Sequence, residues 1–341
     1  MKKLTIEDVA QKAGVSKSTV SQFLNKRYKY MSEATRNRIS EVIDELNYQP
    51  NGLARGLKRN RTNTVGVVVG DINYSLSIQC IHAIENELQL SGNQVMICNA
   101  DENPDKEAKY VETLMSRQVD GLIVFPTGDD SSIYQRLLDE QYPLVFMDRL
   151  MEGIATQSLL VDNEMAVKMA FKEFIRHGHE RIALLTLPAG RYAITPRKER
   201  AFSYRRSVEE AGIEWREEYV CSAPREEMGE ALERLLSLPE PPTALLAAND
   251  IALAEMLKYA NRRSMSIPRD LSVIGIDDAE FAEIYNPAIT TVRQPAYEMG
   301  VQAAKILLAG IEDTGTSVPI TYRFPPTLIK RQSVLAAPKS E

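Results

Sequence analysis

The chain contains few of the residues that build disulfide frameworks, metal centres or membrane anchors. Its 341 residues include three cysteines, three histidines and one tryptophan. Cys80, Cys98 and Cys221 lie far apart and are odd in number, which excludes a disulfide framework and fits reduced thiols. No run of about 18 apolar residues occurs, and acids and a glutamine follow the N-terminus where a signal peptide is apolar. We therefore expect a cytoplasmic protein with no membrane partner.

Sequence signatures of catalysis are also missing. There is no GxSxG, CxxC or GxGxxG motif. The segment GVSKST resembles a phosphate loop but lacks the glycine before the lysine and the preceding strand. HGHE at 177–180 would need a third zinc ligand, and only His82 remains as a further histidine. We therefore expect no catalytic residue, no metal site and no cofactor.

The sequence does have an uneven distribution of charge. The formal net charge is -6 at pH 7. Residues 1–61 contain 13 lysines and arginines against six acids, a balance of +7, so the remaining residues carry -13. A basic head on an acidic body favours binding of one end of the chain to a phosphate backbone. A solvated basic helix surface would have the same composition.

Three short helices are predicted in the basic head. Thr5 with Asp8 starts the first, Gly14 ends it, Ser16 caps the second, and the third follows Ser32. Two such helices joined by a tight turn predict a helix-turn-helix, although other small helical bundles share the pattern. In the second helix we expect Lys17, Ser18 and Gln22 to reach base edges. The remaining DNA contacts, mainly to phosphates, are expected from Thr5, Ser16, Thr19, Ser21, Asn25 and Lys26.

Strands and helices alternate from Val65 onward, after a basic segment rich in asparagine and glycine. That segment, residues 50–64, is only marginally helical alone, so we expect it to become ordered on DNA or on a second chain. The β-branched runs beyond it are bounded by glycine, proline and aspartate. They predict an α/β fold with two doubly wound parallel-sheet lobes and a ligand cleft between the strand ends.

The order of motifs along the chain resembles the lactose/galactose repressor (LacI/GalR) family of transcription regulators. The similar segments run from residue 4 to about 332: TIEDVAQKAGVSKSTVSQFLN, ELNYQPNGLARGL, VGVVVGDI, VDGLIVFP, GHERIALL, ALLAANDIALAEML, LSVIGIDD and NPAITTV. The head also resembles regulators of ketodeoxygluconate and hexuronate use. The resemblance implies a helix-turn-helix head over residues 1–49, a hinge helix over 50–63 and an effector-binding core over 64–341. Its N-lobe would be about 64–160 and 292–320, and its C-lobe about 161–291 and 321–332.

The resemblance implies a homodimeric repressor of carbohydrate-catabolism genes, released from a palindromic operator by a small carbohydrate effector, which would be a sugar, a sugar acid or a sugar phosphate. Hinge residues Asn51 and Arg55 would flank Leu57, which would insert into the minor groove, unless Leu57 only packs between domains. Most relatives have arginine where this chain has Gln22, so adenine, or a water-mediated contact, is expected there in place of guanine. A coiled-coil tail is missing, which favours a dimer. A corepressor-dependent regulator and a sugar-binding protein without regulatory role are the alternatives.

The resemblance also places effector-binding residues at strand ends. The polar pocket residues would be Asp148, Arg200, Asn249 and Asp277, and the rim would be Asp71, Asn73 and Tyr74. For each acid, a structural role as a helix cap or turn residue is the alternative. The arginine-rich loop GRYAITPRKER, together with Arg149, favours an acidic sugar, although solvated surface arginines explain the loop equally well. Trp215, in a hydrophilic stretch, is expected at the surface.

Overall fold

The structure, a computed structural model, describes residues 4–48, 61–188, 194–312 and 318–338. The chain divides into two compact units, Met1–Thr62 and Asn63–Glu341. Each unit has its own hydrophobic core in the described ranges. The hinge positions Asn51, Arg55 and Leu57 lie outside the described residues, so their predicted minor-groove role remains a prediction.

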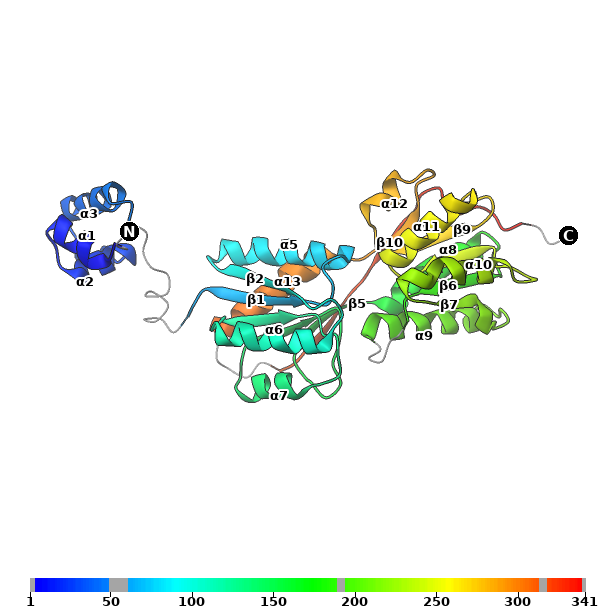
Figure 1. Cartoon of the computed structure of the whole chain (residues 1–341), viewed down its shortest axis with the longest axis horizontal. Helices are drawn as coiled ribbons and strands as arrows, with labels where there is room; N and C mark the ends of the chain where they lie inside the picture. The colour runs from blue at the N-terminus through cyan, green and yellow to red at the C-terminus, as the bar shows by residue number, and fades with distance from the viewer. Residues whose placement is uncertain (1–3, 49–60, 189–193, 313–317, 339–341) are drawn as a thin grey trace. The chain divides into compact units, whose positions relative to one another are not determined.

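The first unit contains three helices, α1 (Ile6–Ala13), α2 (Lys17–Leu24) and α3 (Glu33–Glu45) (Figure 1). Thr5 and Asp8 form a capping box, and Gly14 ends α1 in the left-handed region at φ 62°. The Ser16 side chain accepts a hydrogen bond from the backbone N–H of Thr19 at 3.1 Å. The predicted helix-turn-helix is therefore confirmed. Its core is made by side chains that recur on the inner helix faces, chiefly Val9, Ala13, Val20, Ile39 and Val42.

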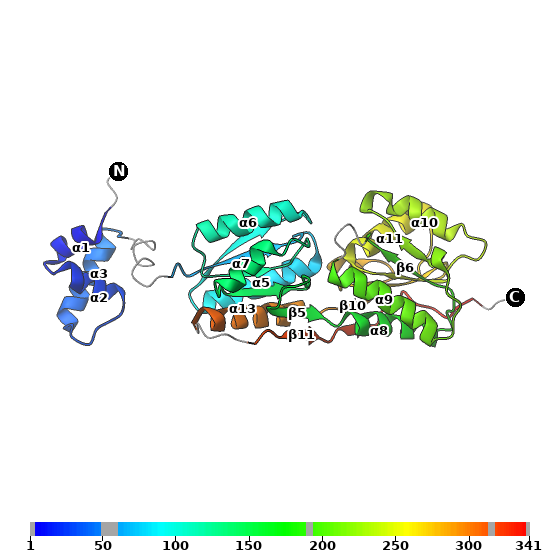
Figure 2. The ribbon, with the colours of Figure 1, turned by 90° about the horizontal axis from the view of Figure 1, so that it is seen from below.

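The second unit consists of two lobes, each built around a six-stranded sheet (Figures 1 and 2). We name as N-lobe the sheet of order β11-β5-β4-β3-β1-β2, in which all strands are parallel. Helices α5 and α13 lie on this sheet and pack closely against each other. A Cβ on Gly300 of α13 would lie 2.6 Å from the carbonyl oxygen of Cys80 in α5. The N-lobe elements are β1 (Thr64–Val69), α5 (Ser75–Leu90), β2 (Gln94–Asn99), α6 (Pro104–Ser116), β3 (Gly121–Val124), α7 (Ser132–Asp139), β4 (Leu144–Met147), β5 (Gln157–Val161), α13 (Ala296–Glu312) and β11 (Thr321–Phe324).

We name as C-lobe the sheet of order β12-β10-β9-β8-β6-β7 with its helices. Only the β10–β12 pair is antiparallel, and the remaining pairs are parallel. The predicted pair of doubly wound α/β lobes is thus confirmed. The C-lobe elements are α8 (Asn163–Arg176), β6 (Ile182–Thr186), α9 (Thr195–Glu210), the 3-10 turns η1 (Glu217–Tyr219) and η2 (Arg225–Glu227), β7 (Val220–Ser222), α10 (Met228–Leu236), β8 (Ala244–Ala247), α11 (Asp250–Arg263), β9 (Ser272–Ile276), α12 (Glu280–Ile284), β10 (Thr290–Arg293) and β12 (Thr327–Ile329).

The chain crosses between the lobes after β5, after β10 and after β11. The expected assignment of residues 321–332 to the C-lobe is wrong for β11, which pairs with β5 in the N-lobe sheet. Tyr322 and Phe324 pack on the N-lobe core, whereas Leu328 packs on the C-lobe core. The intervening prolines 325–326 interrupt the ladder, so the crossing falls there. Likewise β10 lies in the C-lobe sheet, so the N-lobe resumes after Arg293 and not at 292.

Candidate functional site

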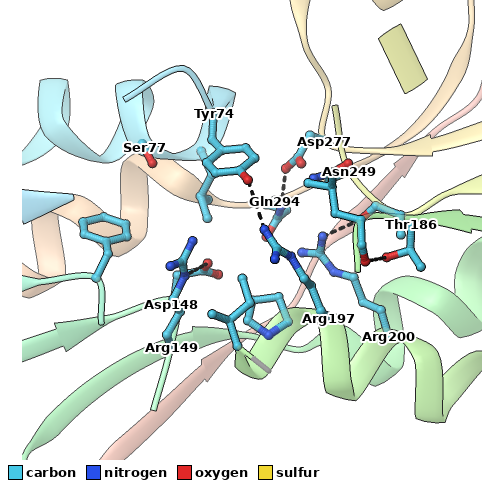
Figure 3. A pocket seen from close by; sticks show the side chains of 16 residues that line it. Tyr74, Ser77, Asp148, Arg149, Thr186, Arg197, Arg200, Asn249, Asp277 and Gln294 are labelled. Carbon is cyan, nitrogen blue, oxygen red and sulfur yellow. Dashed lines mark hydrogen bonds and ion pairs between the residues drawn. The ribbon is translucent and has the colours of Figure 1, made fainter. Parts of the chain in front are cut away.

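A pocket lies between the two lobes of the second unit (Figure 3). Parallel strands of an α/β sheet present ligand-binding groups beyond their carboxyl ends, and both sheets end here. The space free of atoms, including the opening to solvent, is about 560 Å³. The polar lining residues come from both lobes and from the crossing after β10: Tyr74, Ser77, Asp148, Arg149, Thr186, Arg197, Arg200, Asn249, Asp277 and Gln294.

Asp148 and Asp277 occupy corresponding positions in the two lobes. Asp148 follows β4 and Asp277 follows β9, the third strand in each sheet order. Both have left-handed backbone conformations, with φ of 61° and 80°. That region is uncommon for residues other than glycine, asparagine and aspartate, and it turns both carboxyl groups toward the pocket. Strained backbone of this kind gathers at binding sites, where the surrounding structure maintains it.

The pocket carboxyl groups hold protons more tightly than ordinary carboxyl groups. Burial raises the pKa of Asp148, partly opposed by the positive charges of Arg149 and Arg200. Burial likewise raises the pKa of Asp277, whose carboxylate accepts hydrogen bonds from the Gln294 side chain and from the backbone N–H of Asp250. Desolvated carboxyl groups of this kind favour a ligand that supplies hydrogen-bond donors.

The carboxyl group of Asp250 joins the two lobes but does not line the pocket. As the first residue of α11 in the C-lobe, it accepts a hydrogen bond at 2.8 Å from the backbone N–H of Ser75, the first residue of α5 in the N-lobe. The positive end of α5 favours such a carboxylate. Burial and the charge of Asp277 nevertheless raise the pKa of Asp250 to about 7.

Three arginines line the pocket, but they differ in what they already bind. Arg149 makes a two-pronged ion pair with Glu102, at 2.5 and 3.2 Å. Arg200 is buried and donates to the Asn163 side chain at 2.8 Å and to the Ala248 carbonyl at 2.6 Å. Arg197, three residues earlier in α9, donates at 3.2 Å to the hydroxyl of Tyr74 in the other lobe.

Three buried polar atoms of the pocket have no hydrogen-bond partner among the described residues. They are Asp148 Oδ1, Arg149 Nε and Gln294 Oε1. Buried polar groups in folded proteins are nearly always paired, so unpaired ones at a shared cavity indicate a missing partner. Two acceptors and one donor require a partner that both donates and accepts, as hydroxyl groups do.

The structure brings most, but not all, of the predicted effector residues to this pocket. Tyr74, Asp148, Arg200, Asn249 and Asp277 line it. The Asn249 side chain also caps α11 by accepting from the backbone N–H of Ala252 at 2.9 Å.

Two predicted rim residues lie elsewhere. Asp71 and Asn73 do not line the pocket, because the Asp71 carboxylate folds back onto the backbone N–H and side-chain amide of Asn73, both at 2.8 Å. They form a local turn outside the set of lining residues, and their rim role remains a prediction.

Sequence reasoning overlooked several lining residues. The spacing of three between Arg197 and Arg200 places both on one face of α9 and could have revealed Arg197. Thr186 ends β6, a strand-end position like those used for Asp148 and Asp277. Gln294 gave no comparable signal, because its place depends on the crossing after β10.

The helix-turn-helix presents a separate polar surface on α2. Lys17, Ser18 and Gln22 are exposed, as base-reading side chains must be. Thr5 and Ser16 are exposed but already act as helix caps. The remaining predicted contacts are Thr19, Ser21 and Asn25, which are half-buried, and Lys26, which is exposed.

His179 and Trp215 have structural surroundings. The ring of His179 is buried and lies within hydrogen-bonding distance of the Thr243 and Ser272 hydroxyls and of the Leu335 carbonyl. Trp215 is half-buried and does not line the pocket. It packs with its ring 5.9 Å from that of Tyr204 on α9, and the Arg205 guanidinium lies 5.2 Å from it.

Known proteins share both halves of this architecture. Residues 5–51 match the model of bacterial regulatory proteins of the lacI family, and residues 171–334 match a periplasmic binding protein-like domain. The chain is 43% identical over 334 residues to the HTH-type transcriptional regulator EndR of Paenibacillus polymyxa, covering 97% of this chain and 98% of that one. The chain belongs to the LacI family of bacterial regulatory proteins.

Further comparisons agree with this assignment. The HTH-type transcriptional regulator KdgR of Bacillus subtilis (strain 168) is 31% identical over 334 residues, with 97% of each chain covered. The solved complex of the transcriptional regulator CelR with cellobiose superposes with a TM-score of 0.71 at 27% identity, covering 97% of this chain and 100% of that one. This LacI-family chain is therefore a DNA-binding transcriptional regulator and not an enzyme.

Neither a membrane-spanning helix nor a metal-binding group of side chains occurs in the part of this LacI-family regulator that the structure describes. In the described ranges, no helix combines the length and apolar character of a membrane span. Over the same part of the chain, no group of three His, Cys, Asp or Glu side chains has an arrangement that could hold a metal ion.

Asp250 should make the stability of this LacI-family regulator depend on pH near neutrality. Its folded-state pKa of about 7 lies above the unfolded value, so the folded core binds a proton that the unfolded chain does not. The free energy of unfolding should therefore rise as pH falls from 8 to 6, by about 1.4 kcal/mol. We expect Asp250→Asn to lose this increment. Urea denaturation of both proteins at the two pH values measures it.

The difference between wild type and variant isolates Asp250 from other titrating groups. The pKa of His179 is lowered by burial, so its own contribution has the opposite sign and cancels in the difference. Asp105→Asn, at an exposed position in α6, is the matched control and should keep the wild-type pH dependence. An equal pH dependence in wild type and Asp250→Asn would contradict the prediction.

Proposed function

We propose that the chain is a repressor whose hold on operator DNA is released by a small polyhydroxylated effector bound between the lobes. The observation that carries this is the group of unpaired buried atoms, Asp148 Oδ1, Arg149 Nε and Gln294 Oε1, in one pocket of a family member that also has a helix-turn-helix. The genes it controls would be those of carbohydrate catabolism, and chromosomal DNA as the target would place it in the cytoplasm.

A neutral sugar suits the pocket better than a sugar acid. Asp148 and Asp277 are acceptors for hydroxyl groups, and the related CelR structure contains cellobiose. Arg149, which would have favoured an acid, already pairs with Glu102. Arg197 also lies 3.9 Å from Glu102, so Arg200 is the lining arginine without a carboxylate partner among the described residues, and the sugar acid stays the second choice.

Release of the protein from operator DNA requires the effector to bind one arrangement of the two lobes more tightly than the other. An effector that weakens operator binding about 100-fold must prefer the non-binding state by about 2.7 kcal/mol. The same architecture accommodates the opposite sign, a corepressor that tightens binding. In the repressing state, Lys17, Ser18 and Gln22 would read bases, and Thr5, Ser16, Thr19, Ser21 and Asn25 would support the phosphate contacts.

A homodimer is the proposed assembly. The N-lobe exposes Ile78 on α5 and Ile97 on its edge strand β2, at 54% and 45%, and the C-lobe exposes Ile284 at the end of α12, at 82%. Such side chains mark an interface where they form one contiguous patch, which the proposed dimer requires of the isoleucines within one lobe. Sedimentation equilibrium should give twice the chain mass of 38.3 kDa; a monomer at micromolar concentration would contradict the proposal.

A duplex selection and a ligand screen test the proposed function, and neither requires the operator or the effector to be known. Repeated selection of random duplexes on the purified full-length protein should enrich a near-palindromic sequence. A thermal-shift screen should then compare neutral sugars with their matched sugar acids, and a hit should weaken binding to the enriched duplex. Enrichment of no palindrome, or a hit that leaves DNA binding unchanged in both directions, would contradict a ligand-controlled regulator.

Gln22 should set the base preference at one operator position. Its amide can pair with the adenine edge, whereas arginine pairs with guanine. We expect Gln22→Arg to move the preferred base at that position from adenine to guanine, by about 1–3 kcal/mol of discrimination. Repeating the duplex selection with the variant measures it. Thr35→Ser, at the start of α3, should leave the preference unchanged.

A further inference from the structure

A line of hydrogen bonds leads from the pocket to the place where the chain crosses between the lobes. Arg200 Nε donates to Asn163 Oδ1, and Asn163 Nδ2 donates to Glu199 Oε2, both at 2.8 Å. Asn163 is fully buried at 0% exposure and is the first residue of α8, directly after the crossing from β5. Its amide oxygen and nitrogen thus each have one assigned partner.

Glu199 continues this line into the other lobe. Its carboxylate accepts from both terminal nitrogens of Arg323, at 2.6 and 3.1 Å. Glu199 belongs to α9 of the C-lobe, whereas Arg323 belongs to β11 of the N-lobe sheet. Figure 2 shows β11 beside β5 where the lobes join, in agreement with their pairing. A two-pronged arginine–carboxylate pair fixes orientation as well as distance.

The other acidic residues of α9 do not have this role. Glu209 pairs with Arg205 and Glu210 pairs with Arg206, each one turn apart on the same helix. Those pairs lie at the surface and stay within the C-lobe. Glu199 differs because it joins a pocket arginine, through Asn163, to a strand of the opposite lobe.

We propose that Asn163, Glu199 and Arg323 are positioning residues that couple Arg200 in the pocket to the angle between the lobes. A shift of Arg200 moves Asn163, whose side-chain oxygen accepts from Arg200 Nε. It thereby also moves the Glu199 carboxylate, which binds Arg323 of β11. Conversely, a movement of β11 moves Arg200, because coupling is reciprocal. The inference adds a route for the proposed effector response, but the mechanical connection exists without any effector.

Two backbone amides report the closure of the cleft directly. The Ser75 N–H donates to Asp250 across the lobes, and the Leu150 N–H donates to the Thr195 hydroxyl of α9, both at 2.8 Å. Opening of the lobes breaks both bonds and exposes both amides to exchange. Hydrogen–deuterium exchange of the full-length protein, without effector or DNA, therefore measures the coupling and does not depend on the outcome of the sugar screen.

We expect Arg323→Gln and Glu199→Gln to accelerate exchange at Ser75 and Leu150 about fivefold, as expected for the loss of one ion pair. Peptides from β1, β3, β6 and β8 should exchange as in wild type. Arg206→Gln is the matched control, because it removes ion pairs of the same helix, to Glu210 and to Glu164 of α8, that stay in the C-lobe. It should leave both cleft amides unchanged.

A second variant changes Asn163, the buried residue that links Arg200 to Glu199. Asn163→Ala leaves the Glu199–Arg323 pair in place but disconnects it from Arg200, so the same two amides should again exchange faster. If this variant does not fold, the half-exposed Arg323 still decides the question. Unchanged exchange at Ser75 and Leu150 in Arg323→Gln overturns the proposal. Acceleration of exchange that is confined to β5 and β11, or that is spread evenly over both sheets, also overturns the proposal.

Discussion

Replacing Arg200 with alanine is expected to abolish effector binding. The guanidinium lines the pocket, and its charge opposes the effect of burial on the pKa of Asp148 and of Asp277. Its loss removes charge-assisted hydrogen bonds to the effector, each of about 1.5–3 kcal/mol. It also leaves the Asn163 side chain and the Ala248 carbonyl without a donor. We expect an affinity loss of at least about 100-fold, or roughly 2.7 kcal/mol.

Isothermal titration with the effector found in the screen measures the loss. Arg206→Ala, two turns further along α9 at the surface, is the matched control and should bind like wild type. Circular dichroism and urea denaturation separate loss of binding from loss of the fold. Wild-type affinity in a folded Arg200→Ala protein would mean that the effector binds elsewhere.

Removing residues 1–62 is expected to abolish DNA binding while leaving the core folded. The boundary coincides with the division between the two compact units. The deleted part carries the basic charge, and the remaining chain has a net charge of -13, which repels a phosphate backbone. We expect affinity for the enriched duplex to fall by more than about 10³-fold.

Fluorescence anisotropy with a labelled duplex measures this loss, and the thermal shift with effector shows that the core is intact. The core contains its own buried clusters around both sheets, so it does not need the head to fold. Residual specific DNA binding by residues 63–341 would show that the helix-turn-helix is not the main DNA contact. Loss of the thermal shift would show that the pocket depends on the head.

The local features of the fold could be predicted because short-range chemistry determines them. The Thr5–Asp8 capping box, the left-handed Gly14 and the Ser16 cap each involve residues within three positions of one another. The central strands are short, fully buried apolar runs, such as GLIV in β3 and ALLA in β8, bounded by turn residues. In contrast, β7 is three residues long and β5 follows a loop without a marked turn signal, and neither was predicted.

The acids of the pocket were predictable because strand ends supply them, whereas Arg200 of α9 was predicted only from the family resemblance. Asp148 and Asp277 follow buried strands, so the rule for parallel sheets places them at the cleft. Asp71 also follows a strand, β1, but its carboxylate accepts hydrogen bonds from Asn73 and the residue is not among those that line the pocket. Arg149 lies in the pocket, but its charge is compensated by Glu102, a residue far away in the sequence.

The roles of Asp250 and Glu199 depend on contacts between the lobes, which no local pattern encodes. Asp250 is 175 positions from its partner Ser75, and Glu199 is 124 positions from Arg323. Both pairs join residues of different lobes, so they depend on how the crossings place the lobes relative to each other. A single sequence gives the types of residue available for such contacts but not their pairing.

The packing of Trp215 has a practical consequence. Its indole lies against Tyr204 and Arg205 of α9, the helix that also carries Arg197 and Arg200. Since the chain contains one tryptophan beside 14 tyrosines, the tryptophan emission of the unlabelled protein, excited selectively, comes from a single environment. Any displacement of α9 would change the polarity and quenching around that indole, so the protein carries its own optical reporter of pocket occupancy.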